Sequence, residues 1–352
     1  MTTDTVGGVW SYSLQLSEAL GRYGIEVALA TMGPLPTEYQ KQAAERLPNI
    51  KLHESNFRLE WMENPWQDLE RAGTWLLNLE ELLSPDIIHL NGYVHGALPW
   101  NAPVCVVAHS CVLSWWEAVR REKAPADWES YRMAVIKGVR GADCVIAPSG
   151  AMLSAVHKHY GDHTSSTVIY NGISASNFPS AEKQPFVFCA GRLWDSAKNI
   201  ETLARCAANL PWSFVIAGDG ELACDLPQNV TLVGKIPPET VAFHMARAAI
   251  YCLPARYEPF GLSILEAAYS GCALILGDIP SLRELWESAA VFVDPEDHTA
   301  IRNSLLELMS NETKRITLSS LARARAQKFS DQHMISAYLT RYEQMMSTAT
   351  KV

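Results

Sequence analysis

Short apolar runs alternate with longer segments of helical periodicity along almost the whole chain. Such alternation predicts parallel sheets covered by helices, because two parallel strands can be joined only by a crossover of helical length. Five of the runs precede residue 172 and six follow it, which predicts an α/β fold with two Rossmann-like domains in a chain of 352 residues. The expected strands are Ile25–Ala30, Ile87–Leu90, Val104–Ala108, Cys144–Ala147, Thr167–Tyr170, Phe186–Ala190, Ser213–Ala217, Val230–Val233, Ile250–Leu253, Ala273–Leu276 and Val291–Val293.

The clearest break in this pattern lies at Gly172–Gln184, where an Asn-Gly pair and several serines interrupt the periodicity. We therefore expect an N-terminal domain over residues 1–172, a C-terminal domain over 173–330 and a terminal helix over 331–352. The N-terminus is unusual, because only Met1–Thr5, followed by Val6, come before the glycines at positions 7 and 8. An α/β domain normally has a full apolar strand at that place, so we expect a first strand that is short or truncated.

The charge balance and the cysteine pattern exclude several classes of protein. A net charge of −9, from 29 basic and 38 acidic residues, disfavours a nucleic-acid partner held by general attraction to phosphate. No apolar stretch approaches the roughly 20 residues of a membrane span, and no signal pattern opens the chain. Neither Cys-x-x-Cys nor His-Glu-x-x-His occurs, so no metal site is indicated. We expect a cytoplasmic protein, with peripheral contact at the inner membrane surface as an alternative.

The strongest local signal is the segment Arg256–Glu266, with the sequence RYEPFGLSILE. It follows an expected strand and precedes a helical run. Pro259 and Gly261 predict an irregular turn whose backbone amides can face a ligand. A purely structural reading is also open, in which Ser263 caps the helix and Glu266 completes a capping box.

The second signal is the segment Gly191–Asn199, with the sequence GRLWDSAKN, directly after an expected strand. Ligands of open α/β sheets bind at the carboxyl ends of the strands, where Arg192 and Lys198 are well placed to hold a diphosphate. A helix that begins near Asn199 would add its positive N-terminal end. The alternative is a solvated loop with two ordinary surface charges.

Glycines at other strand ends are weaker signals. Gly7 and Gly8 precede a helix but lack the G-x-G-x-x-G spacing of a dinucleotide site. Gly218 follows one expected strand, where a tight turn without a ligand is nearly as plausible. Val233 ends another expected strand and could offer backbone groups to a base edge.

Together these segments resemble the retaining glycosyltransferases of family 4, which have the GT-B fold of two facing Rossmann-like domains. The resemblance covers nearly the whole chain, and its five elements occur in the order of the family. They comprise a glycine loop, the end of the first domain, a diphosphate loop, an E-x7-E element and a C-terminal helix that crosses back to the first domain. The matching segments are Gly7-Gly8, Ile169–Gly172, Gly191–Asn199, Glu258–Glu266 and Phe329–Met345.

The resemblance implies roles for individual residues. Arg192 and Lys198 would bind the diphosphate of the donor and stabilise its growing charge, which does the work of a metal. Glu266 would accept hydrogen bonds from ribose hydroxyls, and Glu258 would hold the donor sugar. The implied catalytic residues are Arg192, Lys198, Glu258 and His109, the last of which matches a sugar-contacting histidine and is otherwise a structural histidine. The implied donor-binding residues are Gly7, Gly8, Gly191, Gly218, Val233, Phe260, Gly261, Leu262 and Glu266.

The reaction implied by the family is transfer of a hexose from a nucleotide-diphosphate sugar to an acceptor hydroxyl, in polysaccharide or glycoconjugate synthesis. The configuration would be retained because the acceptor hydroxyl attacks the donor sugar on the face that the diphosphate leaves. An oxygen of the leaving phosphate would act as the base. UDP-sugars are favoured, with GDP-mannose and ADP-glucose open, and no cofactor or metal is expected. The acceptor would be a saccharide or a glycolipid. Eight of the 11 tryptophans lie before residue 172 and could stack on sugar rings, although core packing explains most of them.

Other readings stay open at this point. A nucleotide-sugar epimerase or a synthase of a small saccharide such as a disaccharide would share the fold. A non-catalytic nucleotide-sugar binding protein belongs to another class, and release of nucleotide upon addition of a saccharide would separate it from a transferase. A nicotinamide reductase is disfavoured because no G-x-G-x-x-G opens either half.

Overall fold

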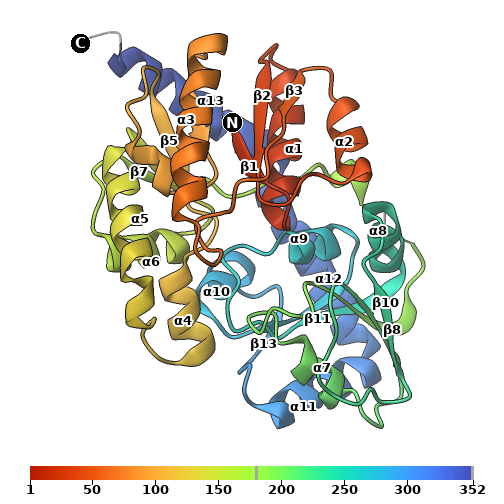
Figure 1. Cartoon of the computed structure of the whole chain (residues 1–352). Coiled ribbons are helices and arrows are strands. Elements are labelled where there is room, and N and C mark those ends of the chain that lie inside the picture. Colours follow the sequence, from red (N-terminus) through yellow and green to blue (C-terminus); the bar gives the residue numbers. More distant parts are fainter. Residues whose placement is uncertain (179–180, 350–352) are drawn as a thin grey trace. The chain divides into compact units, whose positions relative to one another are not determined.

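The computed structural model describes residues 1–178 and 181–349, which separate into two compact units. Unit 1 comprises Met1–Glu117, Glu122–Gly172 and the C-terminal segment from Asp331, and unit 2 comprises Ala118–Arg121 and Ile173–Ser330. Each unit contains parallel strands and helices (Figure 1). The expected α/β class with two Rossmann-like domains is therefore confirmed.

The described residues of unit 1 contain seven parallel strands in two hydrogen-bonded sheets, with the orders β1-β2-β3 and β4-β5-β6-β7. Strand β1 is only three residues long, and it pairs with β2 in the register Thr2 to Ala30. Asn91, directly after β4, links the two sheets, because its side-chain Nδ2 donates to the Thr2 carbonyl at 2.7 Å. The strands are β1 (Thr2–Asp4), β2 (Val27–Met32), β3 (Ile50–His53), β4 (Ile88–Leu90), β5 (Val104–Val107), β6 (Cys144–Ala147) and β7 (Ser166–Val168).

Helices of unit 1 bury the apolar faces that their periodicity predicts. In α1 this face contains Tyr12, Leu16 and Leu20, all of which are buried. The C-terminal helix α13 returns to unit 1 and packs on α1, where the hydroxyl of Tyr12 donates to that of Tyr338 at 2.5 Å. The helices are α1 (Gly8–Gly21), α2 (Glu38–Glu45), α3 (Trp66–Leu83), η1 (Val94–Ala97), α4 (Val112–Arg120, which ends in unit 2), η2 (Ala126–Trp128), α5 (Glu129–Gly141), α6 (Gly150–Tyr160) and α13 (Asp331–Ala349).

Unit 2, in the part that the structure describes, is built on a six-stranded parallel sheet in the order β10-β9-β8-β11-β12-β13. The strands are β8 (Gln184–Ala190), β9 (Ser213–Ala217), β10 (Val230–Gly234), β11 (Ala248–Leu253), β12 (Ala273–Gly277) and β13 (Val291–Val293). Numbered within the unit, this order is 3-2-1-4-5-6, that of a dinucleotide-binding Rossmann sheet. The chain therefore reverses its direction across the sheet between β8 and β11.

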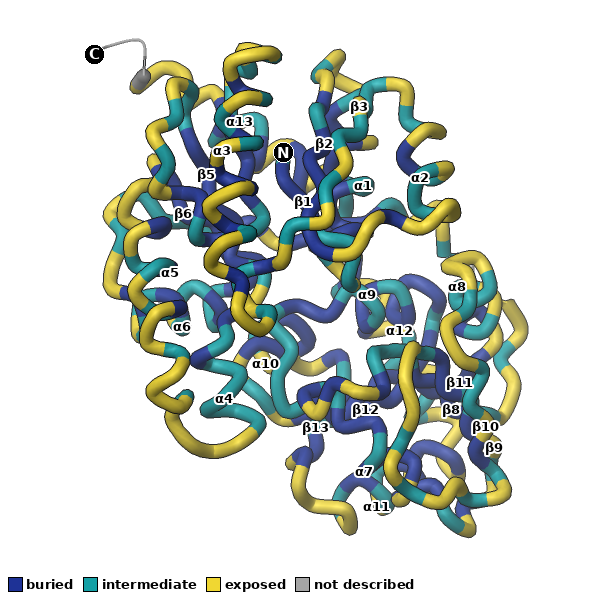
Figure 2. Tube along the Cα trace, viewed as in Figure 1, coloured by how far each residue is buried: buried dark blue, intermediate teal, exposed yellow. Residues whose placement is uncertain are grey.

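Helices cover the sheet of unit 2 as two packed groups, α7 with α11 and α8 with α9 and α12 (Figure 1). Because the central strands are covered on both faces, they are apolar along their length, and β11 and β12 are fully buried (Figure 2). The helices are η3 (Ala175–Asn177), α7 (Ile200–Cys206), α8 (Pro238–Arg247), α9 (Leu262–Tyr269), α10 (Pro280–Trp286), α11 (His298–Ser310), α12 (Glu312–Ala326) and η4 (Gln327–Phe329).

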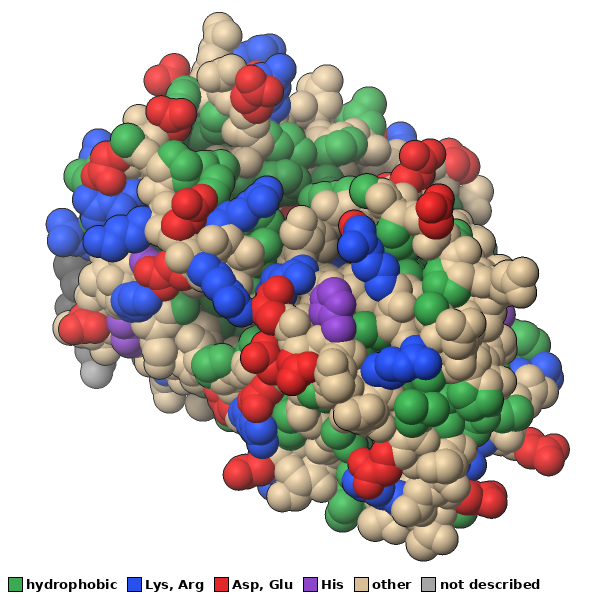
Figure 3. All heavy atoms as spheres, turned by 90° about the horizontal axis from the view of Figure 1, so that it is seen from below, with side chains coloured by type: hydrophobic (Ala, Val, Ile, Leu, Met, Phe, Trp, Pro, Cys, Tyr) green, Lys and Arg blue, Asp and Glu red, His purple; other side chains and the backbone are tan. Residues whose placement is uncertain are grey.

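The strand that the sequence pattern does not predict is β3. It lies at the edge of a sheet, where Lys51 is exposed and the other three residues of Ile50–His53 are only partly buried, so they form no continuous apolar run. Among the residues that the structure describes, no helix combines the length and the apolar character needed to cross a bilayer. On the face shown in Figure 3, basic side chains lie among acidic ones.

Candidate functional site

The reversal of strand order in unit 2 fixes where a ligand of an open α/β sheet would bind, because connections leave β8 and β11 in opposite directions. The segment Gly191–Asn199 leaves the carboxyl end of β8, and the segment Pro254–Gly261 leaves that of β11. A hydrogen bond joins the two segments, from the backbone amide of Arg256 to the carbonyl of Ala197 at 2.8 Å. The two strongest motifs of the sequence thus lie at one edge of the sheet.

The two cations that the sequence marks in these segments are each paired with a carboxylate. Lys198 Nζ lies 2.6 Å from Glu258 Oε2, and the two side chains are only 15% and 11% exposed. Arg192 Nη2 lies 2.6 Å from Asp195 Oδ2, and its guanidinium stacks on the ring of Trp194 at 5.1 Å. The two pairs place positive charge at the strand ends in fixed positions.

Asp195 is held in its charged form although it is buried. Burial alone favours the protonated carboxyl, but Arg192 and Lys198 outweigh it and lower the pKa of Asp195. Its other oxygen accepts a hydrogen bond from the backbone amide of Ala197 at 3.0 Å. Asp195 therefore keeps both the loop and the Arg192 side chain in place.

Backbone segments at this edge approach one another as closely as glycine permits. A Cβ atom added to Gly218 would lie 1.8 Å from the Gly191 carbonyl oxygen. The amide of Gly218 donates to the carbonyl of Gly234 at 2.9 Å, which joins the ends of β9 and β10. Val233 lies between Leu232 and Gly234, where the register of β10 shifts. Side chains of Lys198 and Leu193 flank these glycines, so a ligand at this edge would lie beside Lys198.

Helix α9 does not begin with Ser263 as its N-cap, which was the structural alternative for this segment. Gly261 is the N-cap, with φ of +87°, and no side chain caps the helix. Ser263 lies inside the first turn, where its hydroxyl accepts a hydrogen bond from Tyr251 at 2.8 Å. The capping box of Ser263 and Glu266 is therefore wrong, and the first amides of α9 have no side-chain acceptor at the N-cap.

Glu266 therefore does not bond to the N-terminus of its own helix, as a capping box would require. Within residues 1–178 and 181–349, its carboxylate has no hydrogen-bond or ion-pair partner. Burial raises the pKa of Glu266 to about 7. A half-buried carboxyl without a donor is suited to accept hydrogen bonds from a ligand.

Residues flanking Gly261 contribute backbone rather than side chains. The ring of Phe260 is buried and lies 5.6 Å from that of Phe329, so it belongs to the core of unit 2. Leu262 is partly buried against the same core. The Phe260 ring is therefore taken up by the core, and the backbone groups beside Gly261 remain for a ligand.

Three predicted site residues lie in unit 1. Gly7 is the N-cap of α1 and Gly8 its first residue, and both are exposed. His109 follows β5, and its ring meets the ring of Tyr12 edge-on at 4.5 Å. His109 Nε2 lies 2.8 Å from Asn91 Oδ1, and burial lowers the pKa of His109 to about 3.

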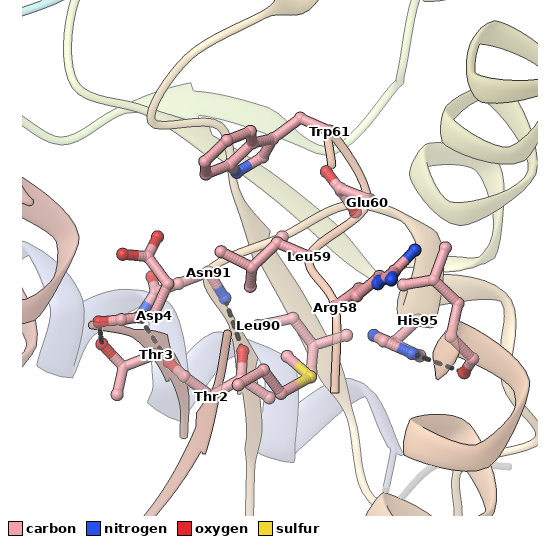
Figure 4. A pocket seen from close by; sticks show the side chains of 13 residues that line it. Thr2, Thr3, Asp4, Arg58, Leu59, Glu60, Trp61, Leu90, Asn91 and His95 are labelled. Atoms are coloured by element: carbon pink, nitrogen blue, oxygen red, sulfur yellow. Dashed lines mark hydrogen bonds between the residues drawn. The ribbon is translucent and has the colours of Figure 1, made fainter. Parts of the chain in front are cut away.

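Unit 1 also contains a pocket at the carboxyl ends of β1 and β4 (Figure 4). Glu60 accepts hydrogen bonds from the amides of Tyr93 and Val94, both at 3.0 Å, yet burial raises its pKa to about 7. Trp61 lines the pocket and is 39% exposed, which leaves part of its ring accessible. The lining comes from Thr2–Asp4, Met32, Arg58–Trp61, Leu69, Leu90–Gly92 and His95.

The structure brings the unit 2 motifs together and reveals a residue that the sequence did not mark. Lys198 pairs directly with Glu258, Gly191 contacts Gly218, and a Cβ atom at Gly261 would contact the Glu258 side chain at 3.3 Å. Asn91, which contacts His109, was not predicted. Its only signal in the sequence is a polar residue directly after a strand, which many turns share.

Comparison with known families gives two matches that together span most of the chain. The model described as "Glycosyltransferase Family 4" matches residues 6–177, and that described as "Glycosyl transferases group 1" matches residues 174–325. Glycogen synthase of Mycobacterium tuberculosis is 25% identical over 320 residues, which cover 79% of this chain and 76% of that protein. O-antigen chain mannosyltransferase B of Escherichia coli is 28% identical over 114 residues, and the match covers 32% of this chain and only 30% of that protein.

Solved structures share the fold at low sequence identity. Sucrose-phosphate synthase from Thermosynechococcus elongatus has a TM-score of 0.83 and 21% identity, with 99% of this chain and 96% of that chain covered. Anabaena HepE in complex with UDP-glucose has a TM-score of 0.76 and 18% identity, with both chains fully covered.

Proposed function

The chain belongs to glycosyltransferase family 4, and we propose that it moves a hexose from a nucleotide-diphosphate sugar to an acceptor hydroxyl with retention of configuration. In this proposal unit 2 binds the donor and residues 1–172 present the acceptor. The C-terminal helix α13 (Asp331–Ala349) would complete the acceptor domain; residues 350–352 of the expected terminal segment lie outside the described residues. The biological role is synthesis of a polysaccharide or a glycoconjugate.

The observation that carries the proposal is the pair of cations at the switch point of the unit 2 sheet. Breaking the glycosidic bond places negative charge on the leaving diphosphate, and fixed cations stabilise that charge because they need no reorientation. Lys198 is nearly buried and Arg192 is held by Asp195 and Trp194. These two side chains take the role that a divalent metal would otherwise have, so we propose a metal-independent reaction.

Donor hydroxyls have acceptors beside the cations. Glu266 would accept hydrogen bonds from the ribose, which would lower its raised pKa because the bonds favour the charged carboxylate. Glu258 and the backbone of Phe260, Gly261 and Leu262 would hold the donor sugar and the phosphate. Gly191, Gly218 and Val233 would present backbone to the nucleotide. We favour a UDP-sugar, since HepE, which shares the fold, was solved with UDP-glucose.

Retention requires that the acceptor attack from the face that the diphosphate leaves. A phosphate oxygen on that face is the base that receives the proton of the acceptor hydroxyl, and the protein supplies orientation and charge stabilisation. Gly7 and Gly8 would allow the backbone to approach the phosphate and the acceptor. His109 would contact a sugar hydroxyl.

The unit 1 pocket is our candidate for the acceptor. The accessible part of the Trp61 ring can stack on a sugar, and the carboxyl groups of Asp4 and Glu60 can accept hydrogen bonds from its hydroxyls. The acceptor would then be a saccharide or the sugar of a glycolipid. A cytoplasmic location, with contact at the inner membrane surface in the glycolipid case, would suit either substrate.

The test combines a thermal-shift panel of UDP-, GDP- and ADP-sugars with an assay of product. A donor raises the melting temperature according to its concentration over Kd, so the panel identifies the nucleotide. The best donor is then incubated with candidate saccharides in EDTA, and the anomeric configuration of the product is read by NMR. We expect an α-linked product from an α-linked donor. An inverted product, or turnover that stops in EDTA and returns with metal, would contradict the proposal.

The same assay separates the rival functions. An epimerase would convert the nucleotide sugar without an acceptor, and a binding protein would shift the melting temperature without releasing nucleotide. A synthase of a small saccharide would accept a free monosaccharide or its phosphate and form a disaccharide.

A further inference from the structure

Asn91 connects the first strand of unit 1 to the candidate site residue His109. Its Nδ2 atom lies 2.7 Å from the Thr2 carbonyl oxygen (Figure 4) and 3.1 Å from Ser13 Oγ. A carbonyl oxygen can only accept a hydrogen bond, so the nitrogen of the amide must face Thr2. The backbone amide of Asn91 also donates to Thr2 Oγ1 at 2.9 Å. Contacts of both its side chain and its backbone with Thr2 therefore hold Asn91 in place, with the side-chain nitrogen toward Thr2 and Ser13.

Two imidazole rings meet the oxygen on the other side of this amide. Asn91 Oδ1 lies 2.8 Å from Nε2 of His109 and 3.1 Å from Nε2 of His89. An amide oxygen has two lone pairs and no proton, so both Nε2 atoms must carry hydrogen. Burial lowers the pKa of both histidines to about 3, so each ring is neutral near pH 7 and its Nδ1 carries no proton.

The two Nδ1 atoms have different surroundings. His89 Nδ1 lies 2.7 Å from the hydroxyl of Tyr342 on α13, which donates to it. His109 Nδ1 has no hydrogen-bond partner within residues 1–178 and 181–349. The Tyr12 ring, 4.5 Å from the His109 ring, limits rotation of that ring. His89 is thus a satisfied structural histidine, whereas His109 retains one unused acceptor.

We infer that Asn91 is a positioning residue that holds His109 in the Nε2-protonated tautomer and leaves Nδ1 to accept a hydrogen bond from a substrate hydroxyl. The tautomer follows from the contacts alone, and the role toward substrate rests on the proposed transferase function. The unprotonated Nδ1 makes His109 selective for hydrogen-bond donors. A sugar hydroxyl can donate to the bare nitrogen, whereas a phosphate or carbonyl oxygen would place its lone pair against that of Nδ1. His109 therefore recognises a hydroxyl and not the diphosphate.

The tautomer is measurable without any activity assay. In the full chain labelled with ¹⁵N on histidine, a long-range proton–nitrogen correlation near pH 7 distinguishes Nδ1–H, Nε2–H and doubly protonated rings. The His109→Gln variant assigns the signal by its loss. We expect the Nε2–H pattern for His109 in the wild-type chain, and a shift to mixed tautomers in Asn91→Leu. A wild-type signal from an Nδ1–H or a charged ring would overturn the inference, whether or not the variant folds.

A second experiment tests the role of Nδ1 toward substrate. At position 109, Asn places an amide oxygen near the site of Nδ1, whereas Gln reaches only toward the site of Nε2 and Asn91. We expect His109→Asn to keep about tenfold more kcat/KM than His109→Gln, with the Kd for the nucleotide unchanged in both. Equal loss in the two variants, or greater activity in the Gln variant, would overturn the substrate role. Failure of the transferase proposal would instead appear as an absence of transfer by the wild-type chain, with the tautomer unaffected.

Discussion

The polar cluster of unit 2 is built on charge, and that of unit 1 is built on neutral hydrogen bonds. Lys198 and Arg192 each face a carboxylate at 2.6 Å, whereas the histidines around Asn91 have pKa values lowered to about 3 by burial. A partly buried cation is stable only beside an opposite charge. When an anionic ligand binds, the ligand can supply that opposite charge in place of the carboxylate. A neutral network instead fixes which atom donates and which accepts. The difference suits a diphosphate in unit 2 and sugar hydroxyls in unit 1.

The two carboxyl groups with raised pKa values extend this comparison. Burial raises the pKa of both Glu60 in unit 1 and Glu266 in unit 2 to about 7. Glu60 accepts hydrogen bonds from the backbone amides of Tyr93 and Val94, which bind it into the loop. Glu266 accepts none in the described part of the chain. A raised pKa thus accompanies a carboxyl group that already accepts backbone hydrogen bonds in unit 1 and one that accepts none in unit 2.

The largest effect that we predict is that of Lys198→Ala. Removal of this ammonium should lower transfer by about 100-fold or more, because it also leaves Glu258 as an unpaired carboxylate beside the diphosphate. The matched control is Lys314→Ala, which breaks a lysine–glutamate pair with Glu307 on exposed helices. Steady-state kcat/KM for the donor measures both. A Lys198→Ala enzyme within threefold of wild type would show that the unit 2 charges are structural.

A glycine in each unit tests whether close backbone packing serves the site or only the fold. A Cβ atom at Gly218 would lie 1.8 Å from Gly191, and one at Gly138 would lie 1.8 Å from the Tyr93 carbonyl oxygen. Alanine at either position should cost about 3 kcal/mol of unfolding free energy, measured by urea denaturation. Only Gly218→Ala should also weaken donor binding in a calorimetric titration at a temperature where both variants are folded. Equal donor affinity in the two would separate Gly218 from the donor site.

Glu266→Gln and Glu60→Gln should change the pH dependence of stability to different extents. A folded-state pKa of about 7, above the ordinary 4.5, means that the folded protein retains a proton that the unfolded chain has lost. The free energy of unfolding therefore falls as the pH rises from 4.5 to 7, and this carboxyl group makes it change no further above pH 7. Glu266→Gln should recover about 3 kcal/mol at pH 8 in urea denaturation, and Glu60→Gln less, because it loses carboxylate bonds to two amides. Equal gains would contradict the distinction between the two groups.

Arg192→Ala should have the smallest of these effects. Its guanidinium is more exposed than the Lys198 ammonium, so we expect about a tenfold rise in the Kd for the donor. The control is Arg205→Ala, which breaks an exposed pair with Glu201 on α7. If the two arginine variants bind the donor with the same affinity, Arg192 has no part in the site.

Much of the fold could be predicted because fully buried parallel strands are continuous apolar runs. The six strands of unit 2 lie within a few residues of their expected places for this reason. Strand β3 could not be found, since its half-buried residues Ile50–His53 carry no such run. The capping reading places the start of α9 too late, because serine and glycine are both favoured at an N-cap and the N-cap is Gly261, two residues before Ser263.

The candidate site could be predicted only where a motif lies within one segment. Lys198 and Glu258 belong to separate segments, but each follows a recognisable strand and carries a motif of its own. Asn91 has neither advantage. Its role depends on contacts with Thr2, 89 positions away, and with His109, and such contacts exist only after β1 and β4 have come side by side.

A calorimetric titration of the best nucleotide sugar into the wild-type chain and the Arg192→Ala/Lys198→Ala double variant tests the central claim most directly. Intact folding of the variant is checked by its thermal unfolding in the absence of ligand. We predict that the wild-type chain binds the donor and that the double variant binds it at least 100-fold more weakly, since both diphosphate cations are gone. Equal affinity in the two proteins would contradict a donor site at the carboxyl ends of β8 and β11.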